Sequence, residues 1–132
     1  MTPLIVAGPS GADAHDGGPY HPEQPLRVSA VMDGVRALGL GDEALYPVYD
    51  EAAMEDLARV HAPGYLVELE AFCARGGGDL DPDTVARADS WRAARRAVGA
   101  GLAALDELER LGEGVVSRRP HGYEGHALAQ PF

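Results

Sequence analysis

The sequence is poor in basic residues and has a single cysteine, and each shortage argues against a class of site. All 11 basic residues are arginines, and 21 acidic residues oppose them, giving a formal net charge of -10. Phosphate neutralisation needs basic clusters, so this balance argues against a nucleic-acid partner. Cys73 has no second cysteine, which excludes an intrachain disulfide and a cysteine-based zinc site.

Long apolar runs are missing as well. No stretch approaches the roughly 20 residues that a membrane-spanning helix needs, and the apolar N-terminal segment lacks the basic residues of a signal peptide. We therefore expect a cytoplasmic protein with no membrane partner. The length of 132 residues and the hydrophobic content of 45% predict one globular domain over residues 1–132.

Hydrophobic patterning predicts an α/β fold. Short apolar runs at residues 4–7, 44–49 and 114–117 are typical of strands, and we expect the first to be buried. Helical spacing predicts helices over about 28–38, 54–60, 65–72 and 90–111, with Ser90 as the N-cap of the last. Residues 8–25 and 79–84 are expected to be loops. The order predicts a partial parallel sheet of about three strands, flanked by helices in three layers.

Three motifs follow one another along the chain. Residues 15–27 contain H-D and then H-P-E-Q-P-L-R, residues 57–66 read L-A-R-V-H-A-P-G-Y-L, and residues 76–91 carry G-G-G-D-L-D-P-D-T and then S-W before an alanine-rich helix. In this order and spacing the chain resembles the N-terminal part of the histone deacetylase, acetoin-utilisation and acetylpolyamine amidohydrolase family. The resemblance implies an open α/β sheet, truncated here relative to the family, and zinc-dependent hydrolysis of a C–N amide bond.

In that family the zinc lowers the pKa of its bound water to about 7, and a histidine pair moves protons beside it. The family's zinc ligands, an Asp-x-His and a later Asp, follow the part that this chain resembles, as does a catalytic tyrosine. We therefore assign no metal ligand and no cofactor to this chain alone, and expect zinc in the complete family domain. The only Asp-x-His here, Asp13-Ala14-His15, lies in the opening loop.

A fourth segment departs from the family pattern R-P-P-G-H-H-A. The colinear residues run from Arg119 to Gly125, with Tyr123 and Glu124 in place of the histidine pair. The resemblance makes Glu124 a candidate general base, Tyr123 a candidate hydrogen-bond donor, and Gly122 a residue of the substrate pocket. The alternative is that Tyr123 and Glu124 are solvated loop residues.

Four further residues are candidates for substrate binding by resemblance. His21 and Glu23 match a pocket wall, Arg27 matches an arginine lining the internal cavity below the metal, and Asp83 matches an aspartate on the pocket rim. The alternatives are a loop-stabilising hydrogen bond for His21 and Glu23, a surface charge for Arg27, and a turn residue for Asp83.

Three hypotheses follow for the function. The chain supplies the substrate-pocket half of a deacetylase-like amidohydrolase and is inactive alone, with an acylated amine such as an acetyl-lysine-like molecule as ligand. Alternatively it is a non-catalytic binding module, or half of a split enzyme completed by a second chain. An altered, truncated gene product is the third reading. A half-sheet exposes apolar surface and a strand edge, so we expect a homo-oligomer or a complementing C-terminal chain.

Overall fold

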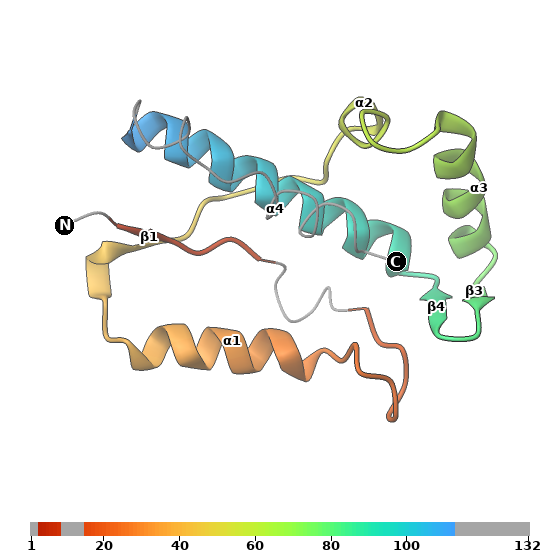
Figure 1. Ribbon diagram of the computed structural model, residues 1–132, viewed down its shortest axis with the longest axis horizontal. Coiled ribbons are helices and arrows are strands. Elements are labelled where there is room, and N and C mark those ends of the chain that lie inside the picture. The colour runs from red at the N-terminus through yellow and green to blue at the C-terminus, as the bar shows by residue number, and fades with distance from the viewer. Residues whose placement is uncertain (1–2, 9–14, 113–132) are drawn as a thin grey trace.

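In the computed structural model the described residues are 3–8 and 15–112, and four helices, a short 3-10 turn and two small sheets make up the fold (Figure 1). The 22-residue helix α4 (Ser90–Leu111) crosses the centre of the molecule, and the other elements lie on its two sides. They are β1 (Leu4–Ile5), α1 (Leu26–Ala37), η2 (Gly41–Glu43), β2 (Ala44–Leu45), α2 (Met54–Leu57), α3 (Pro63–Ala74), β3 (Gly77–Asp81) and β4 (Thr84–Arg87).

The first sheet is the parallel pair β1 and β2. Leu4 lies opposite Ala44 and Ile5 opposite Leu45, and the Val6 amide donates to the Leu45 carbonyl at 2.8 Å. This confirms two strands at the expected places, although β2 ends before Pro47, which has no amide hydrogen to donate. The expected strand at 114–117 lies outside the described residues. The expected burial of the first strand is wrong, because Leu4 is 41% exposed.

The second sheet corrects the sequence analysis, which assigned residues 79–84 to a loop. β3 and β4 form an antiparallel hairpin with an irregularity between Asp79 and Asp81. Backbone pairing holds this polar segment, and Ala86 on β4 is fully buried. Gly77 allows the sheet to close, since its φ is +76° and a β-carbon there would lie 2.3 Å from the Ala86 carbonyl oxygen. The sequence predicted a loop here because the side chains of the segment are mostly polar.

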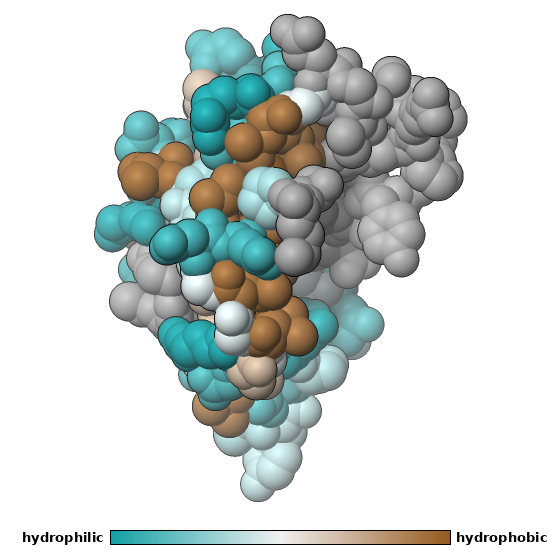
Figure 2. All heavy atoms as spheres, turned by 90° about the vertical axis from the view of Figure 1, so that its left-hand side faces the viewer, coloured by the Kyte–Doolittle hydropathy of each residue, from teal (hydrophilic) through white to brown (hydrophobic). Residues whose placement is uncertain are grey.

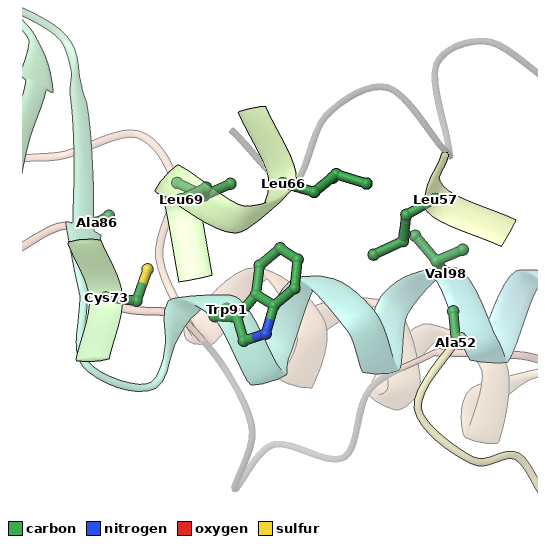
Figure 3. Close-up of a cluster of buried hydrophobic side chains, with 8 residues drawn as sticks. All are labelled: Ala52, Leu57, Leu66, Leu69, Cys73, Ala86, Trp91 and Val98. Carbon is green, nitrogen blue, oxygen red and sulfur yellow. The ribbon is translucent and has the colours of Figure 1, made fainter. Parts of the chain in front are cut away.

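The hydrophobic core lies on one side of α4, where α2, α3 and the hairpin pack. Figure 3 shows Trp91 and Val98 of α4 facing leucines of α2 and α3. The indole of Trp91 donates to the Glu70 carboxylate at 3.1 Å. Cys73 is 1% exposed, and burial raises the pKa of its thiol, which agrees with an inert core residue. The buried apolar residues of this cluster are Ala52, Leu57, Leu66, Leu69, Cys73, Ala86, Trp91 and Val98.

The four helices lie where the sequence predicts them, but some of their ends differ from the predicted ones. α4 spans the expected residues, but its N-cap is Asp89 and Ser90 is its first helical residue. α2 is shorter than expected, and the amides of Val60 and His61 then continue in turns that bond to the Leu57 carbonyl. Within the described ranges, no helix is both long and apolar enough to cross a membrane.

The opposite side of α4 is less densely covered. β1 packs on α4, and α1 lies beyond it without a single buried residue. Figure 2 shows hydrophobic side chains gathered down the middle of the face where the two parallel strands and the C-terminal ends of α1 and α4 lie. Leu4, Leu38 and Leu111, from β1 and from these helix ends, are 41%, 63% and 42% exposed.

Candidate functional site

A cavity of about 610 Å³ lies between α1 and α4 and is the candidate site. The loop of residues 15–25 and the tip of the hairpin close it at one end. Its apolar wall comes from α1, from the segment that follows β1, from β4 and from the alanines of α4. Its polar groups come from the loop, the hairpin, Arg27 of α1 and the first residue of α4. The four polar residues that the sequence singled out all line it: His21, Glu23, Arg27 and Asp83.

His21 joins two segments that are 62 residues apart. Its Nε2 lies 2.8 Å from the Asp83 carbonyl oxygen, and its Nδ1 lies 3.0 Å from the Glu23 amide nitrogen. A carbonyl can only accept and an amide N–H can only donate, so Nε2 carries the proton and Nδ1 is bare. The ring packs against Gly17, where a β-carbon would lie 2.6 Å from its Cγ. These contacts fix the neutral Nε2–H tautomer of His21.

Glu23 and Arg27 form an ion pair one helical turn apart, at the start of α1. Their side chains are 61% and 63% exposed, so the pair contributes little to stability. The buried position that the resemblance implies for the arginine is not observed. Arg27 pairs with Glu23 at the exposed start of α1.

Asp83 lies at the exposed tip of the hairpin. Its amide donates to the Asp81 carboxylate at 3.0 Å, and its own carboxylate accepts from the Thr84 hydroxyl at 3.2 Å. The turn interpretation therefore holds for its local contacts. At the same time its carbonyl holds His21 and the residue lines the cavity, so Asp83 also belongs to the candidate site.

His15 and Ser90 form a further pair that the sequence did not reveal. His15 Nδ1 lies 2.7 Å from Ser90 Oγ, and the same hydroxyl oxygen accepts from the Arg87 amide at 2.7 Å. Ser90 is 1% exposed, and both residues line the cavity. The signal available in the sequence was a histidine in a glycine-rich loop and a serine at a helix start. Nothing in it joined two residues 75 positions apart.

Burial lowers the pKa of His15, and the nearby charges of His21 and then Arg87 act in the same direction. The carboxylates of Glu23 and Asp16 oppose that shift. The net effect favours the neutral imidazole. The base of the cavity is therefore uncharged on the histidine side, while carboxylates lie at its mouth.

The candidate residues Gly122, Tyr123 and Glu124 lie outside the described residues, as does Asp13. In the described part of the chain, no group of three or more His, Cys, Asp or Glu residues is arranged to hold a metal ion. A catalytic zinc needs about three protein ligands, so the described side chains do not fit one.

Comparison with known structures defines the class of fold. The chain superposes on the structure of the HDA15 HD domain with a TM-score of 0.63 at 23% identity, over 76% of this chain and 30% of the matched chain. The described elements are therefore part of the α/β fold of a deacetylase domain. The family model for the histone deacetylase domain matches residues 21–129. The chain belongs to the histone deacetylase family.

Curated relatives agree with this assignment. A probable deacetylase of Methanothermobacter thermautotrophicus is 31% identical over 91% of this chain and 35% of its own length. The histone deacetylase-like amidohydrolase of Pseudomonas aeruginosa is 33% identical over 80% of this chain and 27% of its length. The human polyamine deacetylase HDAC10 is 30% identical over 81% of this chain and 17% of its own length. The chain thus spans about a third or less of the length of these relatives.

Proposed function

We propose that this chain forms the substrate-pocket part of a zinc-dependent, deacetylase-like amidohydrolase, and that the 132-residue chain alone is inactive. The observation that carries the proposal is the convergence of His21, Glu23, Arg27 and Asp83 on one cavity. Three of those residues come from the first motif of the family pattern, and Asp83 comes from the third. Their common cavity gives the motifs a shared role in binding.

The ligand that suits the cavity is an acylated amine. Val28, Val31 and Met32 offer an apolar wall for a methylene chain, and the carboxylates of Glu23 and Asp83 lie at the mouth, where they can hold an amide N–H or an ammonium. The acidic balance of the chain supports an amine over a phosphate-bearing ligand. One relative, HDAC10, is named a polyamine deacetylase.

Zinc, when bound in a complete domain of this family, polarises the amide carbonyl and activates water. The described residues contribute none of that chemistry. Their part is to bind and orient the amine, with Tyr123 and Glu124 proposed as hydrogen-bond donor and general base near the reacting bond. The metal ligands come from outside the described residues in this proposal.

A second candidate function is a binding module, or one half of an enzyme that a second chain completes. The exposed apolar face around Leu4, Leu38 and Leu111 favours it, because such a face is normally covered by protein. This candidate predicts binding without turnover, and recovery of activity only when the covering chain is added.

The experiment that tests the proposal is titration of the purified chain with N-acetyl-lysine methyl ester and with N-acetylputrescine, followed by NMR. We expect shifts at residues lining the cavity, and Asp83→Asn to weaken binding by roughly five- to ten-fold, the equivalent of one hydrogen bond of about 1 kcal/mol. Asp33→Asn is the matched control, since it removes a carboxylate from α1 outside the cavity, where it pairs with Arg36.

Catalysis is measured on the same samples. We expect no acetate release and no stoichiometric zinc by elemental analysis. One zinc per chain, with turnover that a chelator abolishes, contradicts the inactive assignment. Shifts spread over the molecule with no effect of Asp83→Asn contradict the substrate pocket.

A further inference from the structure

The loop of residues 15–25 is attached to the two elements opposite it through imidazole rings. His15 reaches Ser90 at the start of α4, and His21 reaches the Asp83 carbonyl at the tip of the hairpin. Both histidines, Ser90 and Asp83 line the cavity, so these two hydrogen bonds fix the position of one of its walls.

We propose that His15 and His21 are positioning residues that hold this loop against the cavity only while their rings are neutral, so that protonation releases the loop and opens the site. The inference concerns the cavity wall itself. It holds whether or not the chain takes part in deacetylation.

The hydrogen bonds of His21 supply the first argument. Nδ1 accepts the Glu23 amide while Nε2–H donates to Asp83, an arrangement that only the neutral ring can make. A proton on Nδ1 would face the Glu23 N–H, donor against donor. The ring then turns away from the Glu23 amide, and this rotation takes its Nε2–H out of line with the Asp83 carbonyl.

Charge at the base of the cavity supplies the second argument. Among the described residues, the charged groups that act on His15 include His21, Glu23 and Asp16 from its own loop and Arg87 from β4. His21 faces the Asp83 tip and Glu23. Protonating both rings places two cations in one loop near the Arg87 guanidinium, with the exposed carboxylates of Glu23 and Asp16 as the opposing charges. Since His15 is half-buried, its charged form also loses solvation.

Gly17 packs against the His21 ring, so a substitution there can move the ring without a change of pH. A β-carbon at Gly17 would overlap the His21 ring, with contacts of 2.6 to 2.9 Å to three of its atoms. A methyl group there displaces the ring at any pH. Gly17→Ala therefore mimics the released loop without any change of protonation.

The test is an NMR titration of the full 132-residue chain from pH 7.5 to pH 5.0. Imidazole nitrogen shifts report the protonation of each ring, and NOEs from residue 21 to residues 83–84 and from residue 15 to residue 90 report the closed loop. In the wild-type chain we expect these NOEs to weaken as the rings protonate, because loss of one hydrogen bond lowers the ratio of closed to open loop roughly five- to ten-fold. Trp91 fluorescence should stay unchanged, since the core lies on the other side of α4.

Non-titrating variants give the decisive comparison. Asn places a polar atom near Nδ1 and Gln places one near Nε2, so the double variant His15→Asn with His21→Gln should keep its loop contacts at pH 5.0. His61→Asn is the control, because His61 contacts Tyr65 on α3 and should leave the wild-type transition intact. Gly17→Ala should lack the residue 21 contacts already at pH 7.5.

Three results would overturn the proposal. Wild-type NOEs that persist with both rings protonated show that charge does not release the loop. A double variant that loses its contacts at the wild-type pH shows that other groups control it. A shift of Trp91 emission at the same pH shows global unfolding. Should the double variant not fold, Gly17→Ala decides, since a wild-type pH transition in that variant contradicts the proposal.

Discussion

Gly99 of α4 lies against the backbone carbonyl of Asp50 so closely that a β-carbon at position 99 would sit 1.8 Å from the oxygen. The segment around Asp50 crosses the helix at this point, and the Ala52 amide donates to the Arg95 carbonyl at 3.0 Å. Arg95 returns a hydrogen bond to the Ala52 carbonyl and an ion pair to Glu51, both at 3.0 Å. The close approach therefore joins β2 to α2 across the helix.

Gly99→Ala should destabilise the chain by about 2–4 kcal/mol, because the contact is to backbone and cannot be relieved by a side-chain rotation. Gly34→Ala in α1 is the matched control, since a β-carbon there meets nothing within 4 Å. It should be neutral or stabilise by up to about 1 kcal/mol through helix propensity. Urea unfolding followed by circular dichroism measures both. Equal midpoints for the two variants would contradict this packing.

Leu66→Ala should cost about 2–5 kcal/mol, because Leu66 is 2% exposed within the core and its truncation leaves a cavity. Val67→Ala, its neighbour on α3, changes a side chain that is 59% exposed and should cost under about 0.5 kcal/mol. Thermal unfolding of the two variants measures the difference. A similar loss for both would mean that α3 presents another face to α4.

Stability should fall with acidification in a way that depends on His15. The fold lowers the pKa of His15, chiefly by burial, so the unfolded chain takes up the proton first as the pH falls through about 6.5. The stability held by the neutral ring is present above that pH and is lost progressively down to the folded pKa.

His15→Asn removes that titration, so its unfolding free energy should change less between pH 7.5 and pH 5.5 than that of the wild-type chain. His61→Asn should keep the wild-type slope. Urea midpoints at several pH values measure the three slopes. A slope in His15→Asn as steep as that of the wild-type chain would assign the pH dependence to other groups.

Association should follow from the apolar face shown in Figure 2. Leu38 is 63% exposed at the end of α1, and burial of apolar surface contributes about 25 cal/mol per Å². We expect concentration-dependent association at micromolar concentrations, weakened by Leu38→Glu and unchanged by Val48→Glu, which alters a residue that is 96% exposed on a connecting segment. Analytical ultracentrifugation measures it. A single monomer mass at all concentrations would show that this face stays in water.

The sequence by itself determined the family and most of the helices. Periodicity identified α3 and α4, because the apolar residues of a helix recur with a fixed spacing that survives in any packing. The first and third motifs made His21, Glu23, Arg27 and Asp83 candidates for substrate binding by resemblance, and all four line the same cavity.

Only the tertiary structure decided the rest. The hairpin at residues 77–87 is held by backbone pairing, which its polar side chains do not predict. The helix α1 has the expected apolar spacing but no buried residue, and its burial depends on how closely the other elements pack against it. The contact of His15 with Ser90 and the close approach of Gly99 to Asp50 join residues far apart in the chain. Periodicity gives the face that a residue occupies. Which residue packs against that face depends on the path of the chain in three dimensions, and only the packed fold determines that path.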